Sequence, residues 1–205
     1  MVRNPRIRLL ACAAAGLATL GALSACSGPS DPPPPSHAAH SSTPQASTAA
    51  TASQTPTPTA TPTPVTLTCD DLLSRQQLYD FNPNFGDDPG YKAADGTLSA
   101  KVVQEAGISC GWLNQTSKSV LEVAVATPTK DQLTQAMNAA VKDSNVVPTY
   151  GVPPQVTGYF TAASGSGIAE AFTGAWWVVV TSKDFLEPGD AQPVMAAVLQ
   201  NLAKH

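Results

Sequence analysis

The chain has 205 residues, with 11 Lys and Arg against 15 Asp and Glu and a formal net charge of −4. Three of the cations are Arg3, Arg6 and Arg8, and Arg75 is the only later arginine. This distribution argues against a nucleic-acid partner, because phosphates are bound by clustered Lys and Arg, and against electrostatic docking on anionic lipid.

The first 25 residues have the layout of a cleaved secretory signal peptide. Residues 1–8 are basic, and residues 9–25 are apolar, rich in alanine and end in small side chains. A membrane-spanning helix is the competing interpretation, because about 17 apolar residues lie at the lower limit for a span. No basic stop-transfer cluster follows the apolar run, which favours the signal peptide.

Cys26 lies directly after the apolar run. Leu23, Ser24, Ala25 and Cys26 together resemble the bacterial lipobox, in which an aliphatic and two small residues precede a cysteine. The resemblance implies a diacylglyceryl group on the Cys26 sulfur and cleavage before Cys26; the alternative is an ordinary signal peptide with a chance cysteine. Two acyl chains would anchor the mature protein stably at the extracytoplasmic face of the cell membrane.

Residues 26–65 are dominated by Pro, Thr, Ser and Ala and carry a single charge, Asp31. A segment with almost no large apolar side chain cannot offset the entropy cost of ordering, so we expect a disordered tether. His37 and His40 lie in it, but a metal site needs further ligands at fixed geometry.

Residues 66–205 are expected to form a single α+β domain. Apolar periodicity and capping residues predict helices over residues 70–81, 97–107 (ending at Gly107), 127–144 and 189–205. Alternation predicts strands over residues 108–115, 119–127, 155–163, 167–174 and 175–182, and breaker residues predict loops over 80–91 and 146–154. The order α-α-β-β-α-β-β-β-α with short turns predicts a mainly antiparallel sheet of about five strands, packed by helices.

Cys69 and Cys110 are the two cysteines of this domain. In an exported domain an isolated pair most often forms a disulfide. The alternative is a redox or metal-binding pair, which the absence of a C-x-x-C spacing and of a nearby histidine does not favour.

The chain resembles a family of small actinobacterial lipoproteins that share a domain of unknown function. The shared features are the lipobox, the tether, Cys69 followed by Leu72 and Leu73, and Cys110 followed by Trp112. The resemblance implies a disulfide between Cys69 and Cys110 that holds the first helix to the first strand. It implies no known activity, and the long loop over residues 80–91 departs from the family pattern.

The loop over residues 80–91 is the best candidate for a cation site. Its candidate ligands are Asp80, Asn82, Asn84, Asp87 and Asp88. The first three match the start of a calcium-binding loop, but the later glycine and glutamate positions of that pattern do not match. The alternative is a solvated turn, and we expect no metal or other cofactor.

Trp176 and Trp177 are adjacent in a predicted strand, so their side chains point to opposite faces of the sheet. An exposed tryptophan beside Tyr159 or Phe172 would form a surface for a glycan or an apolar ligand. The alternative is that helices cover both faces.

The predicted domain contains one histidine, the terminal His205, and no recognisable nucleophile motif. We therefore expect a non-enzymatic binding or accessory domain that holds an envelope protein, an apolar ligand or a glycan. The alternative is a cell-wall hydrolase or ligand-processing enzyme that uses the carboxylates of loop 80–91. A purely structural spacer is a third hypothesis.

Overall fold

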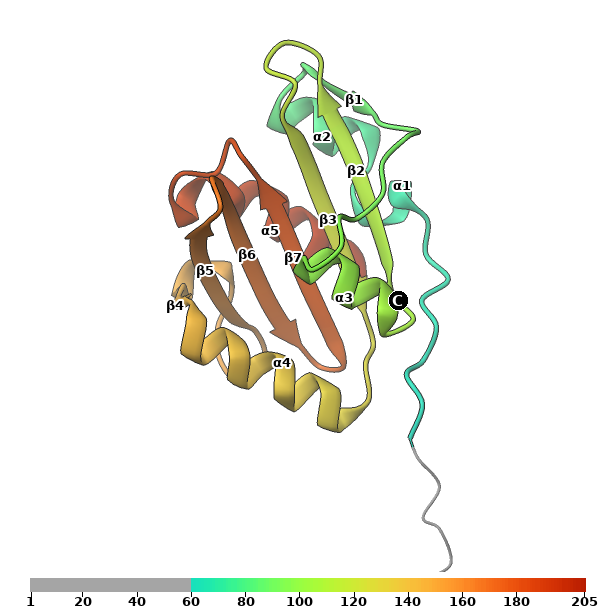
Figure 1. The fold of residues 1–205 in the computed structure, drawn as a ribbon, viewed down its shortest axis with the longest axis vertical. Helices are drawn as coiled ribbons and strands as arrows, with labels where there is room; N and C mark the ends of the chain where they lie inside the picture. The colour runs from blue at the N-terminus through green and yellow to red at the C-terminus, as the bar shows by residue number, and fades with distance from the viewer. Residues whose placement is uncertain (1–59) are drawn as a thin grey trace, which may run out of the picture. The chain divides into compact units, whose positions relative to one another are not determined.

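One antiparallel sheet with helices on both of its faces forms the centre of the structure described for residues 60–205 (Figure 1). The computed structural model describes residues 60–205, which belong to one compact unit. The predicted signal peptide, Cys26 and the tether up to residue 59 lie outside the described residues. Within the described part, no helix combines the length and the hydropathy that crossing a membrane requires.

The sheet contains seven strands in the spatial order β1-β2-β3-β7-β6-β5-β4. Every neighbouring pair is antiparallel, and the short strands β1 and β4 lie at the two edges. The strands are β1 (Phe85–Asp87), β2 (Ile108–Asn114), β3 (Val120–Ala126), β4 (Asn145–Val146), β5 (Thr157–Ala163), β6 (Ser166–Thr173) and β7 (Trp176–Ser182).

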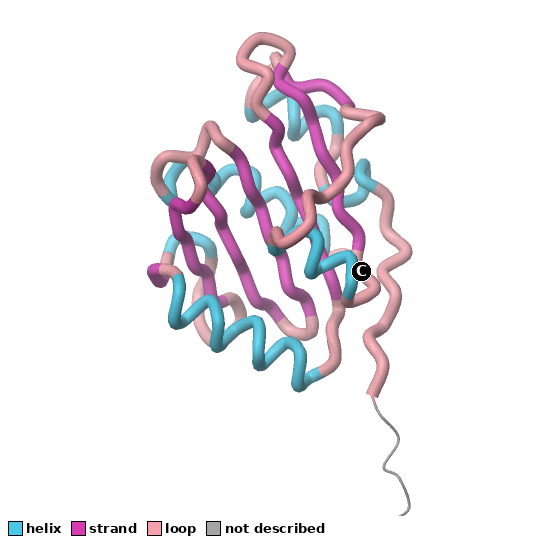
Figure 2. Tube along the Cα trace, in the orientation of Figure 1, coloured by secondary structure: helices cyan, strands magenta, loops and turns pink. Residues whose placement is uncertain are grey.

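Five α-helices and one short 3-10 helix connect the strands of the described chain (Figure 2). They are α1 (Cys69–Leu72), α2 (Arg75–Phe81), α3 (Leu98–Gln104), α4 (Lys130–Asp143), α5 (Pro188–Leu202) and the 3-10 helix η1 (Pro148–Tyr150). Hydroxyl side chains accept a backbone N–H at the start of α1 to α4, as expected for N-capping residues; they belong to Thr68, Ser74, Thr97 and Thr129.

The predicted α+β domain with an antiparallel sheet and one disulfide is confirmed, whereas the predicted count of five strands is wrong. β1 lies within the predicted loop over residues 80–91, and β4 lies at the start of the predicted loop over residues 146–154, one residue of it preceding that loop. Both strands have only two or three residues, so no alternating pattern marks them. The first predicted helix is two helices, because Ser74 is extended and caps α2 by accepting the Gln77 N–H.

Each face of the sheet carries its own hydrophobic core. In β3, the side chains of Leu121, Val123 and Val125 face the core that α1, α2 and α5 cover. Ala124 and Ala126 face the second core, which α3 and α4 cover. The central strands β3, β6 and β7 are therefore buried on both faces, and both cores fix their register.

Residues 63–65, which belong to the predicted tether, contact the domain. Thr63 forms an isolated bridge with Thr127, and its N–H donates to the Thr127 carbonyl oxygen at 3.2 Å. The Val65 N–H donates to the Ala106 carbonyl oxygen at 2.9 Å, and the Val65 side chain packs against the first core. The last residues of the predicted tether thus run beside the domain.

Gly107 does not end α3 in the predicted way. Ala106 takes the left-handed conformation after the helix, with φ of 60°. Gly107 is required for another reason: a Cβ at this position would lie 2.3 Å from the Val125 carbonyl oxygen. The glycine therefore permits close packing against β3.

Candidate functional site

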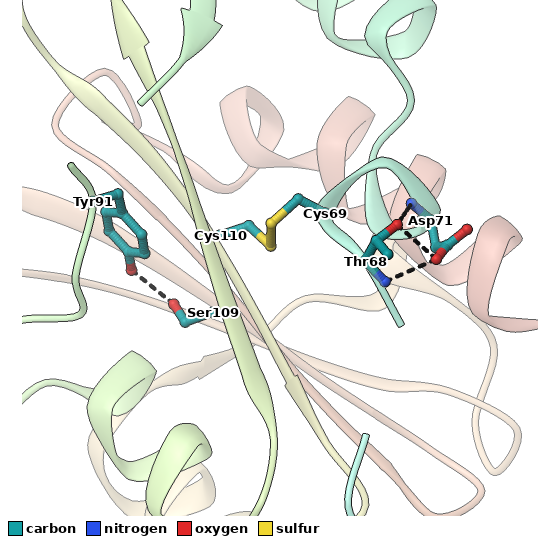
Figure 3. The surroundings of a disulfide bond; sticks show 6 residues. All are labelled: Thr68, Cys69, Asp71, Tyr91, Ser109 and Cys110. Atoms are coloured by element: carbon teal, nitrogen blue, oxygen red, sulfur yellow. Dashed lines mark hydrogen bonds between the residues drawn. A yellow bond between two sulfur atoms is a disulfide. The ribbon is translucent and has the colours of Figure 1, made fainter. Parts of the chain in front are cut away.

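The predicted disulfide between Cys69 and Cys110 is present, and it ties the start of α1 to β2 (Figure 3). The two Cα atoms lie 5.7 Å apart, and 41 positions separate the cysteines in the sequence. In the chain-entropy model, closing a loop of this length stabilises the fold by about 4 kcal/mol. The cross-link holds α1 against the outer strands of the sheet, beside the end of β1.

The pairing of β1 with β2 stops before it covers the whole strand. The Asp88 N–H still donates to the Gly111 carbonyl oxygen at 3.3 Å. The Asp88 carbonyl oxygen, which a continued ladder would offer to the Gly111 N–H, instead accepts the Tyr91 N–H at 3.0 Å. Likewise, the Gly90 N–H donates to Asp88 Oδ1 at 3.2 Å, whereas a continued ladder would direct it to the Ser109 carbonyl oxygen. This turn ends the ladder after Asp88.

A stretch of the β2 edge is left open as a result. The Asn114 N–H donates to the Ser119 carbonyl oxygen, so the even-numbered residues of β2 direct their backbone groups toward β3. The odd-numbered Ser109 and Gly111 direct theirs outward. Among residues 60–205, the Ser109 N–H and carbonyl and the Gly111 N–H have no backbone partner.

A cleft of about 470 Å³ lies over this open stretch, and we call it the β2-edge cleft. Cys69, Asp70 and Arg75 line it on the side of α1 and α2. Tyr91 lies on the opposite side of β2 from Cys69 (Figure 3). The full lining comprises Thr68, Cys69, Asp70, Arg75, Asp87, Asp88, Pro89, Tyr91, Ser109, Cys110, Gly111 and Trp112.

Hydrogen bonds hold the Tyr91 side of the cleft in place. The Tyr91 hydroxyl donates to Glu122 Oε2 at 3.0 Å and lies 2.7 Å from Ser109 Oγ. The Ser99 hydroxyl donates to the same Glu122 oxygen, also at 3.0 Å. Burial raises the pKa of Tyr91 to about 12, so its hydroxyl stays neutral and keeps its proton for donation.

The Tyr91 ring also depends on the glycine beneath it. A Cβ at Gly111 would lie 2.3 Å from the ring. Cys110 and the disulfide occupy one face of β2 at this point, and the Tyr91 ring occupies the other. Packed groups therefore cover both faces of β2 beside the cleft.

Negative charge dominates the β2-edge cleft. Its acidic side chains are Asp70, Asp87 and Asp88, and its one basic side chain is the guanidinium of Arg75. Arg75 lies 4.0 Å from Asp70 and 3.9 Å from Asp87, and all three side chains are mostly exposed. Contacts this long and this exposed contribute little stability. The carboxylates thus remain available to a cationic group.

The structure does not assemble the predicted calcium loop. Asp80 Oδ1 accepts a hydrogen bond from Gln76 Nε2 at 2.7 Å, and Asp80 faces a separate groove of about 580 Å³ between α2 and α5. Asn82 Oδ1 accepts the Asn84 N–H at 3.0 Å, which is a local turn. Asp87 and Asp88 line the β2-edge cleft instead. No group of three metal-ligating acidic, histidine or cysteine side chains occurs in the described chain.

The two tryptophans lie on opposite faces of the sheet, and helices cover both faces. Trp177 is fully buried in the second core and stacks on Phe172 with ring centroids 6.3 Å apart. Trp176 is partly buried and packs against the first core. Tyr159 and Phe172 are buried as well, so the exposed aromatic patch predicted around the tryptophans is not formed.

A buried carboxylate accompanies Trp177. Trp177 Nε1 donates to Glu170 Oε2 at 3.0 Å, and Lys101 Nζ lies 5.4 Å from the centroid of the Trp177 ring. Glu170 is 4% exposed, and burial raises its pKa to about 7. Glu105 is also buried and Glu122 is half-buried, so none of these three glutamates is an exposed surface charge.

Sequence reasoning missed the residues that shape the cleft. Tyr91, Ser109 and Gly111 attracted no functional interpretation, although Gly111 lies between the cysteine and the tryptophan of the Cys-x-Trp motif. A glycine inside a predicted strand signals a close approach by another group, and here that group is Tyr91. Searches of protein-family models, curated proteins and solved structures found no match, and the function is therefore inferred from the chain's own residues.

Proposed function

We propose that this protein is a lipid-anchored, non-enzymatic domain that binds a partner at the extracytoplasmic face of the cell membrane. The lipobox-like sequence ending at Cys26 supports the anchor, and the tether supports display away from the bilayer. The Cys69–Cys110 disulfide supports an oxidising compartment, where structural disulfides form and persist. The same disulfide is the one that the resemblance to small actinobacterial lipoproteins implies.

The β2-edge cleft is the main observation that supports the binding function. The cleft exposes the Ser109 N–H, the Ser109 carbonyl and the Gly111 N–H between two fixed sides. A partner can form hydrogen bonds with these groups, and this kind of binding needs no catalysed reaction. A partner protein fits this surface better than a glycan or apolar ligand, because the tryptophans expected to hold those ligands lie under helices.

The anchor is tested by mass spectrometry of the mature N-terminus. We expect a chain that begins at Cys26 and carries a diacylglyceryl group. A Cys26→Ala variant should lack that mass and leave the membrane fraction after mild washing. An unmodified Cys26 in the native protein, or cleavage at another position, would contradict the anchor.

Binding is tested with the native lipoprotein in detergent, crosslinked to its neighbours and compared with the double variant Asp87→Asn, Asp88→Asn. We expect the variant to retain a specific envelope protein less well, because the two carboxylates line the cleft. A purified protein that cleaves cell-wall material, and loses that activity in the double variant, would favour the hydrolase hypothesis instead.

A further inference from the structure

We propose that the β2-edge cleft takes up an extended, basic peptide segment of the partner protein, which adds to the sheet as a strand beside β2. This inference rests on the proposed binding function and names the chemistry of the partner. Strand addition to an exposed sheet edge obtains affinity from main-chain hydrogen bonds and specificity from the neighbouring side chains. The β2-edge cleft supplies both.

The open backbone groups define the register of such a peptide. In an antiparallel arrangement, the peptide residue opposite Ser109 exchanges two hydrogen bonds with the Ser109 N–H and carbonyl. The carbonyl of a residue two positions earlier in the peptide then accepts the Gly111 N–H. The peptide would not reach further toward Trp112, because Asp88 already occupies the Gly111 carbonyl oxygen.

The chain itself already uses this edge on both sides of the open stretch. The Asp88 N–H donates to Gly111, and the Val65 N–H donates to Ala106 just before β2 begins. Extended chain thus approaches this edge at both ends of the stretch. The three open groups lie between these two contacts, where the cleft provides about 470 Å³.

The charge of the cleft selects a basic peptide. Asp70, Asp87 and Asp88 are opposed within the cleft only by Arg75, whose contacts with Asp70 and Asp87 are long and exposed. Side chains of an extended peptide alternate between the two faces of the sheet. Lysine at alternate positions would therefore direct its ammonium groups to one side of the cleft, where carboxylates are exposed.

The probe is an end-blocked, fluorescently labelled hexapeptide of alternating lysine and valine, measured by anisotropy against the mature lipoprotein in detergent. We expect saturable binding that weakens as salt is raised, because salt screens exposed charges. A peptide with glutamate in place of lysine should bind at least about tenfold more weakly, since like charges repel across the cleft. A peptide with alternate amides N-methylated should lose binding, because it cannot form the ladder.

The matched protein variants are Ser109→Pro and Ser109→Ala. Proline removes the outward N–H but no bond of the β2–β3 ladder, because the backbone of Ser109 faces away from β3. Alanine keeps the N–H and removes only the hydroxyl contact with Tyr91. We expect proline to weaken peptide binding about tenfold, the size of one net hydrogen bond, and alanine to weaken it about twofold.

Several outcomes would overturn the inference. Equal binding of the lysine and N-methylated peptides would exclude a backbone ladder, even if the Ser109→Pro variant failed to fold. Unchanged affinity in a folded Ser109→Pro variant would do the same. If the native protein still retains a specific envelope partner when Ser109 is replaced by proline, strand addition is wrong while the binding function stands. An absent anchor together with no specific partner would refute the proposed function itself.

Discussion

Replacing Glu170 by glutamine is expected to stabilise the domain at neutral and alkaline pH and to leave its stability almost unchanged below about pH 4.5. Glu170 lies in β6 beneath α3 and α4 and is 4% exposed. Burial raises its pKa to about 7; the hydrogen bond from Trp177 and the charge of Lys101 oppose this shift, and the charge of Asp143 adds to it. Glutamine keeps the shape and can still accept the Trp177 N–H.

The size of the effect follows from the two pKa values. The unfolded carboxyl titrates near 4.5 and the folded one near 7. Because the folded pKa is the higher one, the native state binds the proton more tightly. The stability that Glu170 contributes is fully present below pH 4.5 and is lost as the pH rises through 7. The wild type should therefore lose about 3 kcal/mol between pH 4.5 and 8 from this residue alone, and the glutamine variant should not.

The assay is urea unfolding of wild type and Glu170→Gln at pH 5, 6, 7 and 8, followed by tryptophan fluorescence. The difference in unfolding free energy should be about 1 kcal/mol at pH 5 and grow to about 3 kcal/mol at pH 7 and pH 8. Asp95→Asn, which changes an exposed carboxylate in the same way, serves as the control. A difference that stays flat from pH 5 to 8 would refute the reasoning, because it would mean that water or Lys101 solvates the carboxylate in the folded state.

Three further predictions concern the disulfide and the cleft. Replacing Cys69 and Cys110 together by alanine should lower the free energy of unfolding by about 4 kcal/mol in urea titrations, and a loss under about 1 kcal/mol would contradict the entropic account. Hydrogen exchange followed by NMR should show faster exchange for the amides of Ser109 and Gly111 than for Cys110, whose N–H faces β3; equal protection would mean that the edge is covered. Arg75→Ala should tighten binding of the lysine peptide about twofold to fivefold in the anisotropy assay, because it removes the one cation of the cleft, and weaker binding would show that Arg75 helps to hold the peptide.

The long elements of the fold were predictable because their patterns are strong. β6 and β7 follow uninterrupted apolar or alternating sequences, and the Thr129 cap with an amphipathic run predicts α4. The edge strands were not predictable, because a strand as short as β4 is defined by its partner rather than by its own side chains. The disulfide followed from the cysteine count and from the resemblance.

The two tryptophans show where sequence reasoning reaches its limit. Alternation places Trp176 and Trp177 on opposite faces, and this is correct. The alternation of side chains along a strand does not predict which faces of the sheet the helices cover. In the structure, α3 and α4 cover the face on which Trp177 lies. Glu170 could have been predicted as buried, because it shares the inward face of β6 with Ile168 and Phe172. A carboxylate at every-second-residue spacing from apolar side chains in a strand lies on the same face as they do and is therefore expected to be buried.

The open edge of β2 arises because Asp88 forms hydrogen bonds within its own turn instead of continuing the ladder with β2. The sequence pattern of β2 does not reveal this. Asp88 uses its side chain for the Gly90 N–H and its carbonyl for the Tyr91 N–H, and both interactions close a turn. The same turn brings the Tyr91 ring over Gly111, where any other residue would clash with it. If β1 continued by three residues, Gly90 would pair with Ser109 and leave no backbone group for a partner. The turn after Asp88 therefore both opens the edge and builds the side of the cleft, which is why a substitution there should affect peptide binding more than stability.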